Sequence, residues 1–226
     1  MDREKNKNMR PLIIVGGGRL FPVMVGRVLV DKVHNAEFYL DGVFDDRSEL
    51  SSTVRHVSDA HRHRIHHYQS ISSLPLKSQP YFVTAIGDPK QKAVYTEMII
   101  EAGGKFVPLL NDDNEIAFSA QVGDAVLMRN CVIDAMVRVS NYVWVDRNSV
   151  IGHGSKIEEY CHIGPNVTLC GNVTIGKMST VHAGAIIGAD VSIGSGCTVG
   201  LGSVVLRDVE DGATVLGNPA RTVSIV

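Results

Sequence analysis

Residues 145–176, VDRNSVIGHGSKIEEYCHIGPNVTLCGNVTIG, decide the fold of half of this chain. An aliphatic residue returns at every sixth position, and this lattice continues in both directions without a break. The residue four places after each aliphatic is small or slim, and glycine directly follows six of the aliphatics. The lattice consists of Leu127, Ile133, Val139, Val145, Ile151, Ile157, Ile163, Leu169, Ile175, Val181, Ile187, Ile193, Val199 and Val205.

Neither an α-helix nor an ordinary sheet needs a period of six, whereas a parallel β-helix does. Each hexad forms one short strand and one corner, with the aliphatic side chain inside and small residues permitting the tight turn. Three hexads make one coil, so residues 18 apart stack at roughly one strand spacing, about 4.8 Å. The sequence therefore predicts a β-helix with a short tail over residues 114–226.

The first half of the chain alternates strand-like and helix-like segments. Glycine-rich turns and polar junctions separate these segments. Their order predicts a small parallel, Rossmann-like α/β sheet over residues 10–113, with any ligand at the carboxyl ends of its strands. Residues 1–9 are expected to form a flexible tail. The expected strands are 11–15, 38–44, 81–86 and 105–110, and the expected helices are 20–33 and 90–103.

Composition excludes several classes of protein. A net charge of −2 gives no electrostatic basis for binding nucleic acid or an anionic membrane. No apolar run approaches the ~20 residues that span a bilayer, and the charged start lacks the apolar region of a signal peptide. The four cysteines show no disulfide or C-x-x-C spacing, so a reduced, soluble, cytoplasmic protein is expected. They are Cys131, Cys161, Cys170 and Cys197.

The 18-residue coil predicts where the histidines of the β-helix lie. His153 is 18 residues before Gly171 and should stack directly beneath it. His162 is nine residues, or half a coil, from His153, so the two side chains cannot meet within one subunit. They could meet across a three-fold interface between neighbouring β-helices.

The hexad lattice, the segment 161–176 and the closing Gly217-Asn-Pro-Ala-Arg221 resemble the left-handed β-helix sugar acyltransferases. With its α/β domain, the chain is similar to the nucleotide-amino-sugar N-acetyltransferases of the bacillosamine and perosamine type. The resemblance implies a homotrimer that binds acetyl-CoA in the groove between adjacent β-helices. It implies no metal.

The resemblance also assigns roles to five residues of the predicted β-helix. His153 matches the catalytic base and Gly171 the residue whose backbone N–H stabilises the oxyanion. His162 matches the histidine at the thioester end of acetyl-CoA, and Ala183 and Leu201 match backbone contacts to the pantetheine arm. A histidine, with a reference pKa near 6.5, suits the removal of a proton from an attacking amine.

The chain departs from the family next to the base. Relatives usually flank it with acidic residues, but here Gly152 and Gly154 do so. Asp146 is the preferred substitute as the partner that orients His153, ahead of Glu158 or Glu159. The alternative is that Asp146 is a surface carboxylate without a role.

Several residues of the α/β domain are candidates for contacting a sugar nucleotide. The glycine turn after the first strand could be a backbone nest for the diphosphate or only a tight turn. Arg19 follows where the family has histidine, and could add a charge-assisted hydrogen bond. By resemblance, paired acids and a further glycine also line this site. The candidates are Gly16, Gly17, Gly18, Arg19, Asp45, Asp46 and Gly87.

Two groups of charged residues are less informative. The histidines at positions 56, 61, 63, 66 and 67 alternate with arginines, which favours an exposed strand or loop over a metal site or a stacking site for a base. Arg221, with Lys177 and Arg207, could contact the phosphates of CoA.

The predicted function is N-acetylation, by acetyl-CoA, of a nucleotide-linked amino sugar for a bacterial surface glycan, with direct attack and no acyl-enzyme. C4 is the first candidate for the amine, while C3, the stereochemistry and the nucleotide base stay open. O-acetylation of a sugar or sialic acid needs the same groups and is the first alternative. A β-helical zinc enzyme using His153, His162 and His182 is the distant one.

Overall fold

A computed structural model describes residues 9–18, 20–30, 38–62 and 64–223. Its contacts divide the chain into two compact units. One comprises Met1–Gly87 and Gln91–Val107, and the other comprises Asp88–Lys90 and Pro108–Val226. Apart from Met9, the expected flexible tail lies outside the described residues.

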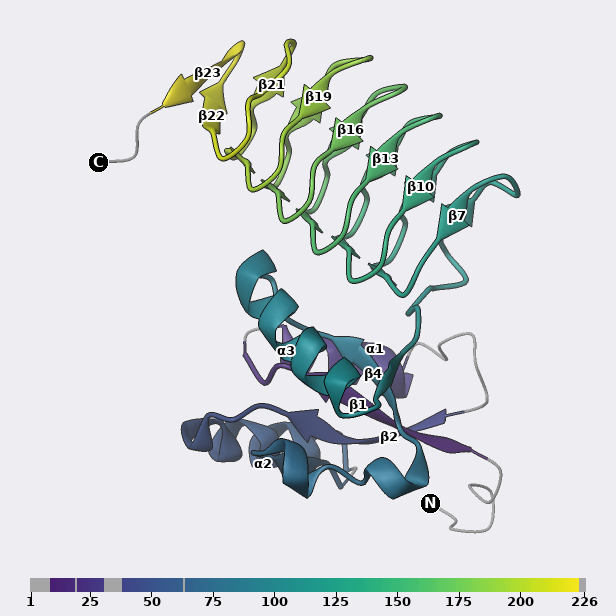
Figure 1. Ribbon diagram of the computed structural model, residues 1–226. Coiled ribbons are helices and arrows are strands. Elements are labelled where there is room, and N and C mark those ends of the chain that lie inside the picture. Colours follow the sequence, from purple (N-terminus) through teal and green to yellow (C-terminus); the bar gives the residue numbers. More distant parts are fainter. Residues whose placement is uncertain (1–8, 19, 31–37, 63, 224–226) are drawn as a thin grey trace. The chain divides into compact units, whose positions relative to one another are not determined.

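The first unit is a parallel five-stranded sheet flanked by helices (Figure 1). Strand order is β3-β2-β1-β4-β5, so the chain runs from the centre to one edge and then restarts on the other side of β1. Ligands of such sheets bind where the order reverses, here outside the carboxyl ends of β1 and β4. The elements are β1 (Arg10–Val15), α1 (Phe21–Val30), β2 (Phe38–Phe44), α2 (Ser51–Ala60), β3 (His66–Tyr68), β4 (Tyr81–Thr84), α3 (Pro89–Glu101) and β5 (Lys105–Phe106).

This unit confirms the predicted sheet and adds elements to it. The structure adds α2, where no helix was expected, and β3, whose histidines were expected to lie in an exposed strand or loop. The strand expected at 105–110 ends at Phe106, because Leu109 already pairs in parallel with Val126 of the β-helix unit. The β-helix unit therefore begins earlier than residue 114.

The second unit is a parallel β-helix with three faces, each a sheet of short strands. Register pairs are 18 residues apart, as in Arg138↔Lys156 and Val150↔Thr168, so each coil contains three hexads. Figure 1 shows β7, β10, β13, β16 and β19 stacked along one face.

We name the faces by their first strands. The β6 face contains β6 (Glu115–Ile116), β9 (Val132–Ile133), β12 (Val150–Ile151), β15 (Thr168–Leu169), β18 (Ile186–Ile187) and β21 (Val204–Val205). The β7 face contains β7 (Gln121–Val122), β10 (Arg138–Val139), β13 (Lys156–Ile157), β16 (Thr174–Ile175) and β19 (Ser192–Ile193). The β8 face contains β8 (Val126–Leu127), β11 (Trp144–Val145), β14 (His162–Ile163), β17 (Thr180–Val181), β20 (Thr198–Val199), β22 (Thr214–Gly217) and β23 (Ala220–Val223).

The interior of the β-helix confirms the hexad prediction. All fourteen lattice aliphatics are buried in one core, and the small residues four places later are buried with them. The serines among these small residues bond to backbone on two coils: Ser149 Oγ donates to the Gly164 carbonyl at 2.9 Å and accepts from the Val167 N–H at 3.2 Å. Because these hydroxyls are paired, a buried serine is tolerated in this core.

Candidate active site

His153 lies at the corner between β12 and β13. Backbone hydrogen bonds stack this corner on its neighbours: the Gly154 N–H donates to the Ala135 carbonyl at 2.9 Å, and the Asn172 N–H donates to the His153 carbonyl at 2.7 Å. The His153 side chain is exposed, and neither ring nitrogen has a hydrogen-bond partner among the described residues. The imidazole is therefore accessible at a rigid position.

Gly171 lies one coil away from His153, against its imidazole. A methyl carbon built on Gly171 would lie 2.5 Å from His153 Nε2 and 2.6 Å from Cε1. The equivalent positions of two nearby coils are Ala135 and Ala189, so the turn itself accepts a side chain. The His153 ring is what requires glycine here, as the 18-residue stacking predicted. Within the described part of the chain, the Gly171 N–H has no acceptor.

The two glycines beside His153 lie where any side chain would clash with the next coil. Gly154 has φ +69°, and a methyl carbon on it would lie 2.3 Å from the side-chain oxygen of Asn172. A methyl carbon on Gly152 would lie 2.7 Å from the backbone carbon of Cys170. An acidic neighbour of His153 would therefore need rearrangement of the next coil.

The structure does not bring Asp146 to His153. Asp146 lies at a different corner, between β11 and β12, where its Oδ1 accepts from the Arg147 N–H at 2.7 Å. Glu159 lies at the third corner and forms an ion pair with Lys177 at 2.9 Å. The predicted orienting contact between Asp146 and His153 is thus not formed within one chain.

His162 is the first residue of β14, on the β8 face. Its ring stacks on that of Trp144, the register partner on β11, with centroids 6.2 Å apart and planes inclined by 11°. Ala183 and Leu201 occupy corners on the two following coils, and Leu201 is 70% exposed. His153 and His162 lie on different sides of the coil, as the half-coil spacing predicted.

In the α/β unit, Asp45 organises the end of β2. Its buried carboxylate accepts from the Gly17 N–H at 2.6 Å and from the Nη2 and Nε of Arg47 at 2.7 and 2.9 Å. Burial alone would raise the pKa of Asp45, but the hydrogen bonds from Arg47 and Gly17 outweigh it and hold that pKa below its ordinary value. His67 Nε2 lies 2.9 Å from the Asp45 carbonyl oxygen. The Asp45 carboxylate is therefore already hydrogen-bonded within the protein, and it stabilises this loop.

Two backbone N–H groups of the glycine turn are already hydrogen-bonded within the protein. The Gly16 N–H donates to the Phe44 carbonyl at 2.8 Å, and the Gly17 N–H is held by Asp45. Gly16 has φ +100° and packs against Ile86, so a side chain there is excluded. The guanidinium of Arg47, whose side chain is 48% exposed, lies next to Gly18. Among the described residues, Arg47 thus places a cation at this turn, and sequence reasoning missed it. The predicted cation, Arg19, lies outside the described residues.

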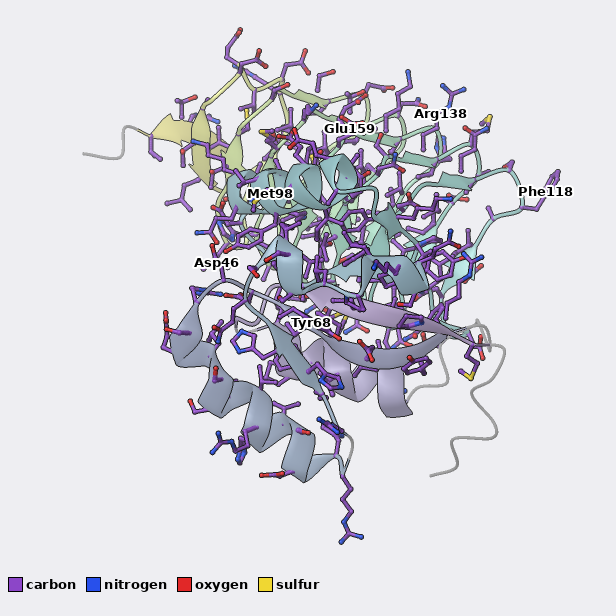
Figure 2. The ribbon with its side chains drawn as sticks, turned by 60° about the horizontal axis from the view of Figure 1, so that its bottom comes forward. Asp46, Tyr68, Met98, Phe118, Arg138 and Glu159 are labelled. Atoms are coloured by element: carbon purple, nitrogen blue, oxygen red, sulfur yellow. The ribbon has the colours of Figure 1, made fainter. Side chains whose placement is uncertain are left out.

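The remaining candidates of this unit lie at the same edge of the sheet. Asp46, labelled in Figure 2, is exposed and accepts a hydrogen bond from the Tyr95 hydroxyl of α3. Burial and this bond to Asp46 raise the pKa of Tyr95. Gly87 lies between β4 and α3. The ends of β1, β2 and β4 therefore meet as predicted, because these strands are neighbours in one parallel sheet.

The model of bacterial transferase hexapeptide repeats (six repeats) matches residues 136–171, which include both His153 and Gly171. The acetyltransferase domain of PglB from Neisseria gonorrhoeae, solved in complex with acetyl coenzyme A, is 26% identical. That comparison covers 95% of this chain and 100% of the domain, with a TM-score of 0.81. Residues 136–171 thus match the hexapeptide-repeat transferase family, and 95% of the chain has the fold of this acetyltransferase domain.

Two further solved structures share the fold of this chain. PerB from Caulobacter crescentus, in complex with CoA and GDP-perosamine, is 22% identical, with a TM-score of 0.78 over 95% of this chain and 97% of PerB. WeeI from Acinetobacter baumannii is 20% identical, with a TM-score of 0.73 over 95% of this chain and 100% of WeeI. The predicted fold class, an α/β domain followed by a left-handed β-helix, is confirmed.

The histidine cluster is not one exposed strand or loop, although part of it lies in β3. His56 is on α2, His66 is an exposed residue of β3, and the neighbouring His67 is half-buried. Besides its contact with Asp45, His67 has Nδ1 3.0 Å from Ser51 Oγ. His67 thus has a structural role beside the glycine turn, and His63 lies outside the described residues.

The basic residues considered for CoA phosphates fall into two groups. Arg207 and Arg221 both line a cavity of about 360 Å³ at the C-terminal end of the β-helix. Lys177 lies elsewhere, paired with Glu159 and 5.4 Å from the Tyr160 ring centroid. Among the described residues, no three His, Cys, Asp or Glu side chains converge as a metal site requires. The helices described here are too short or too polar to cross a membrane.

Proposed function

We propose that this transferase is a cytoplasmic, homotrimeric N-acetyltransferase. It moves acetyl from acetyl-CoA to the amino group, at C4, of a nucleotide-linked amino sugar used for a bacterial surface glycan. The observation that carries this proposal is the contact between the exposed His153 imidazole and Gly171. It gains support from the likeness, over 95% of the chain, to a domain solved with acetyl coenzyme A.

His153 acts as the general base in this reaction. Its exposed, uncommitted imidazole accepts the proton that the amine loses as the amine nitrogen attacks the thioester carbonyl. The same proton then passes to the departing sulfur, so His153 returns to its starting state. The amide C–N bond forms and the C–S bond breaks, giving an N-acetyl sugar and CoA.

Gly171 supplies the electrostatic part of the mechanism. Charge develops on the carbonyl oxygen during the attack, and a positioned N–H stabilises it by about 3–4 kcal/mol when it is aimed at that oxygen. The Gly171 N–H is not used by another acceptor in the described structure, and Nε2 of His153 lies beside Gly171. Base and oxyanion donor are therefore neighbours on consecutive coils.

Arg47 is proposed to bind the diphosphate of the sugar nucleotide. Asp45 fixes its guanidinium next to Gly18, at the start of α1, where a helix N-terminus also favours an anion. Replacing Arg47 by leucine is expected to raise the KM for the sugar nucleotide by about 10-fold, with little change in kcat. The measurement is steady-state kinetics, with Arg55→Leu on the exposed side of α2 as the matched control. An unchanged KM would exclude this role of Arg47.

The trimer is proposed because His153 and His162 lie on different sides of the coil. If each site combines His153 of one chain with His162 of its neighbour, His153→Asn and His162→Asn subunits should complement each other. Random reassembly of equal amounts would restore about a quarter of wild-type activity, since one interface in four receives both intact histidines. Assaying the mixture after refolding checks this, and activity no higher than that of the separate variants would contradict a shared site.

The function is tested with acetyl-CoA and a panel of UDP-, dTDP- and GDP-linked 3-amino and 4-amino sugars, following the release of free thiol. Rapid release with one amino sugar, and none with its hydroxyl counterpart, would establish N-acetylation and name the nucleotide. Release only with the hydroxyl sugar would replace the proposal with O-acetylation. If a trimer that binds acetyl-CoA releases no thiol with any sugar of the panel, nucleotide-linked amino sugars are refuted as the acceptor class.

A further inference from the structure

Trp144 is an unusual residue for its place in the β-helix. It occupies the outward position of β11, where other strands of the β8 face have the smaller residues Val126, Thr180 and Thr198. It is nonetheless fully buried, and it is the one tryptophan of the sequence. Its indole N–H has no acceptor among the described residues, so hydrogen bonding does not explain why tryptophan is present.

What the indole provides is a flat surface for His162. The two residues are register partners on adjacent strands, so the strand spacing places their rings one above the other. The planes are inclined by only 11° with centroids 6.2 Å apart, within the range of offset stacking between aromatic rings. A threonine or valine at position 144 would contact the imidazole but would not select the orientation of its plane.

We propose that Trp144 is a positioning residue for the donor end of the active site, holding the plane of the His162 imidazole. This inference rests on the proposed function, in which His162 meets the thioester end of acetyl-CoA. The second side-chain torsion of histidine is broad, so an imidazole without a flat neighbour samples many orientations. A fully buried indole cannot turn away, and it therefore limits His162 to orientations near its own plane.

Two substitutions separate the flat face of Trp144 from its bulk and its N–H group. Trp144→Phe keeps an aromatic face and removes the unpartnered N–H, while Trp144→Leu keeps apolar bulk without a flat face. We expect Trp144→Leu to raise the KM for acetyl-CoA or lower kcat, with kcat/KM falling about 3- to 10-fold, and Trp144→Phe to stay near the wild type. The KM for the sugar nucleotide should not change in either variant.

Thermal unfolding of both variants distinguishes positioning from a structural role. Wild-type kcat/KM in Trp144→Leu, or an equal loss in Trp144→Phe, would overturn the proposal. Should Trp144→Leu fold poorly, Trp144→Met provides the same comparison with a flexible side chain and no ring. The kcat/KM values are compared only among variants whose Tm equals that of the wild type.

The single tryptophan also reports on the stack without any enzymatic assay. Tryptophan emission, excited selectively over the tyrosines, comes from Trp144 alone. His162→Asn should therefore change its intensity or maximum, and acetyl-CoA titrated into the wild type should do the same. An unchanged emission in His162→Asn would refute the stack itself. If His162→Asn changes the emission but the wild type transfers no acetyl group, the proposed function fails while the stack stands.

Discussion

Asparagine in place of His153 is expected to lower kcat for acetyl transfer by about 10²- to 10⁴-fold while leaving the KM for acetyl-CoA nearly unchanged. The amide is polar and similar in shape to part of the imidazole, but it cannot accept a proton from the attacking amine. His153 is exposed, with no hydrogen-bond partner among the described residues, so its loss removes no structural bond. Stability should therefore be maintained while chemistry is lost.

The matched control for this variant is His56→Asn, an exposed histidine on α2. It should retain wild-type kinetics, because His56 is far in sequence from the β-helix corner and has no place in the proposed site. Full activity of His153→Asn would remove His153 as the base. A proportional loss of acetyl-CoA binding would assign it to donor binding instead.

The β-helix could be predicted from the sequence because its determinants are local and repeated. Each lattice aliphatic marks the buried position of one short strand. The fourteen together determine both the strand positions and the 18-residue coil. The coil length by itself predicts that His153 lies against Gly171, and the two residues do lie in contact. Residues one coil apart in this fold are neighbours by construction, so sequence spacing converts directly into distance.

The α/β unit was predicted less completely because its contacts depend on side-chain conformations that no period determines. The paired acids could be identified, but not that Asp45 is enclosed by Arg47 and Gly17 while Asp46 bonds to Tyr95. Nothing in the spacing distinguishes a carboxylate facing inward from its exposed neighbour. The sequence left open whether the histidines of β3 lie in a strand or in a loop, because the alternation of histidine and arginine is compatible with both.

Sequence reasoning also missed residues of the β-helix that act across coils rather than on the lattice. Trp144 is 18 residues before His162, so the coil length contains the signal for their stacking, although neither residue belongs to the aliphatic pattern. Asp146 illustrates the converse within one chain. It is close to His153 in sequence, yet a separation of six or seven residues in this fold leads to another corner.

Alanine at Gly171 is expected to lower kcat/KM for acetyl transfer by about 10²-fold in a protein that folds normally. Its methyl carbon would lie 2.5 Å from His153 Nε2, so the imidazole must move by roughly an ångström, a displacement that costs about 10²-fold when it affects a catalytic group. The backbone of this turn accepts alanine, as Ala135 and Ala189 demonstrate on nearby coils. The Gly171 N–H is retained, so the loss would report on the position of the base.

A double-mutant cycle makes the Gly171→Ala prediction specific, with kcat/KM and Tm measured for all four proteins. If the methyl group acts only by displacing the imidazole, it should have little effect in the His153→Asn background, because the base is already absent. The two losses would then be far from additive. Additive losses would show that the methyl group disturbs something other than His153, such as the path of the N–H toward the thioester oxygen. Ala189→Gly, at the equivalent turn one coil further, is the control and should leave kcat/KM unchanged.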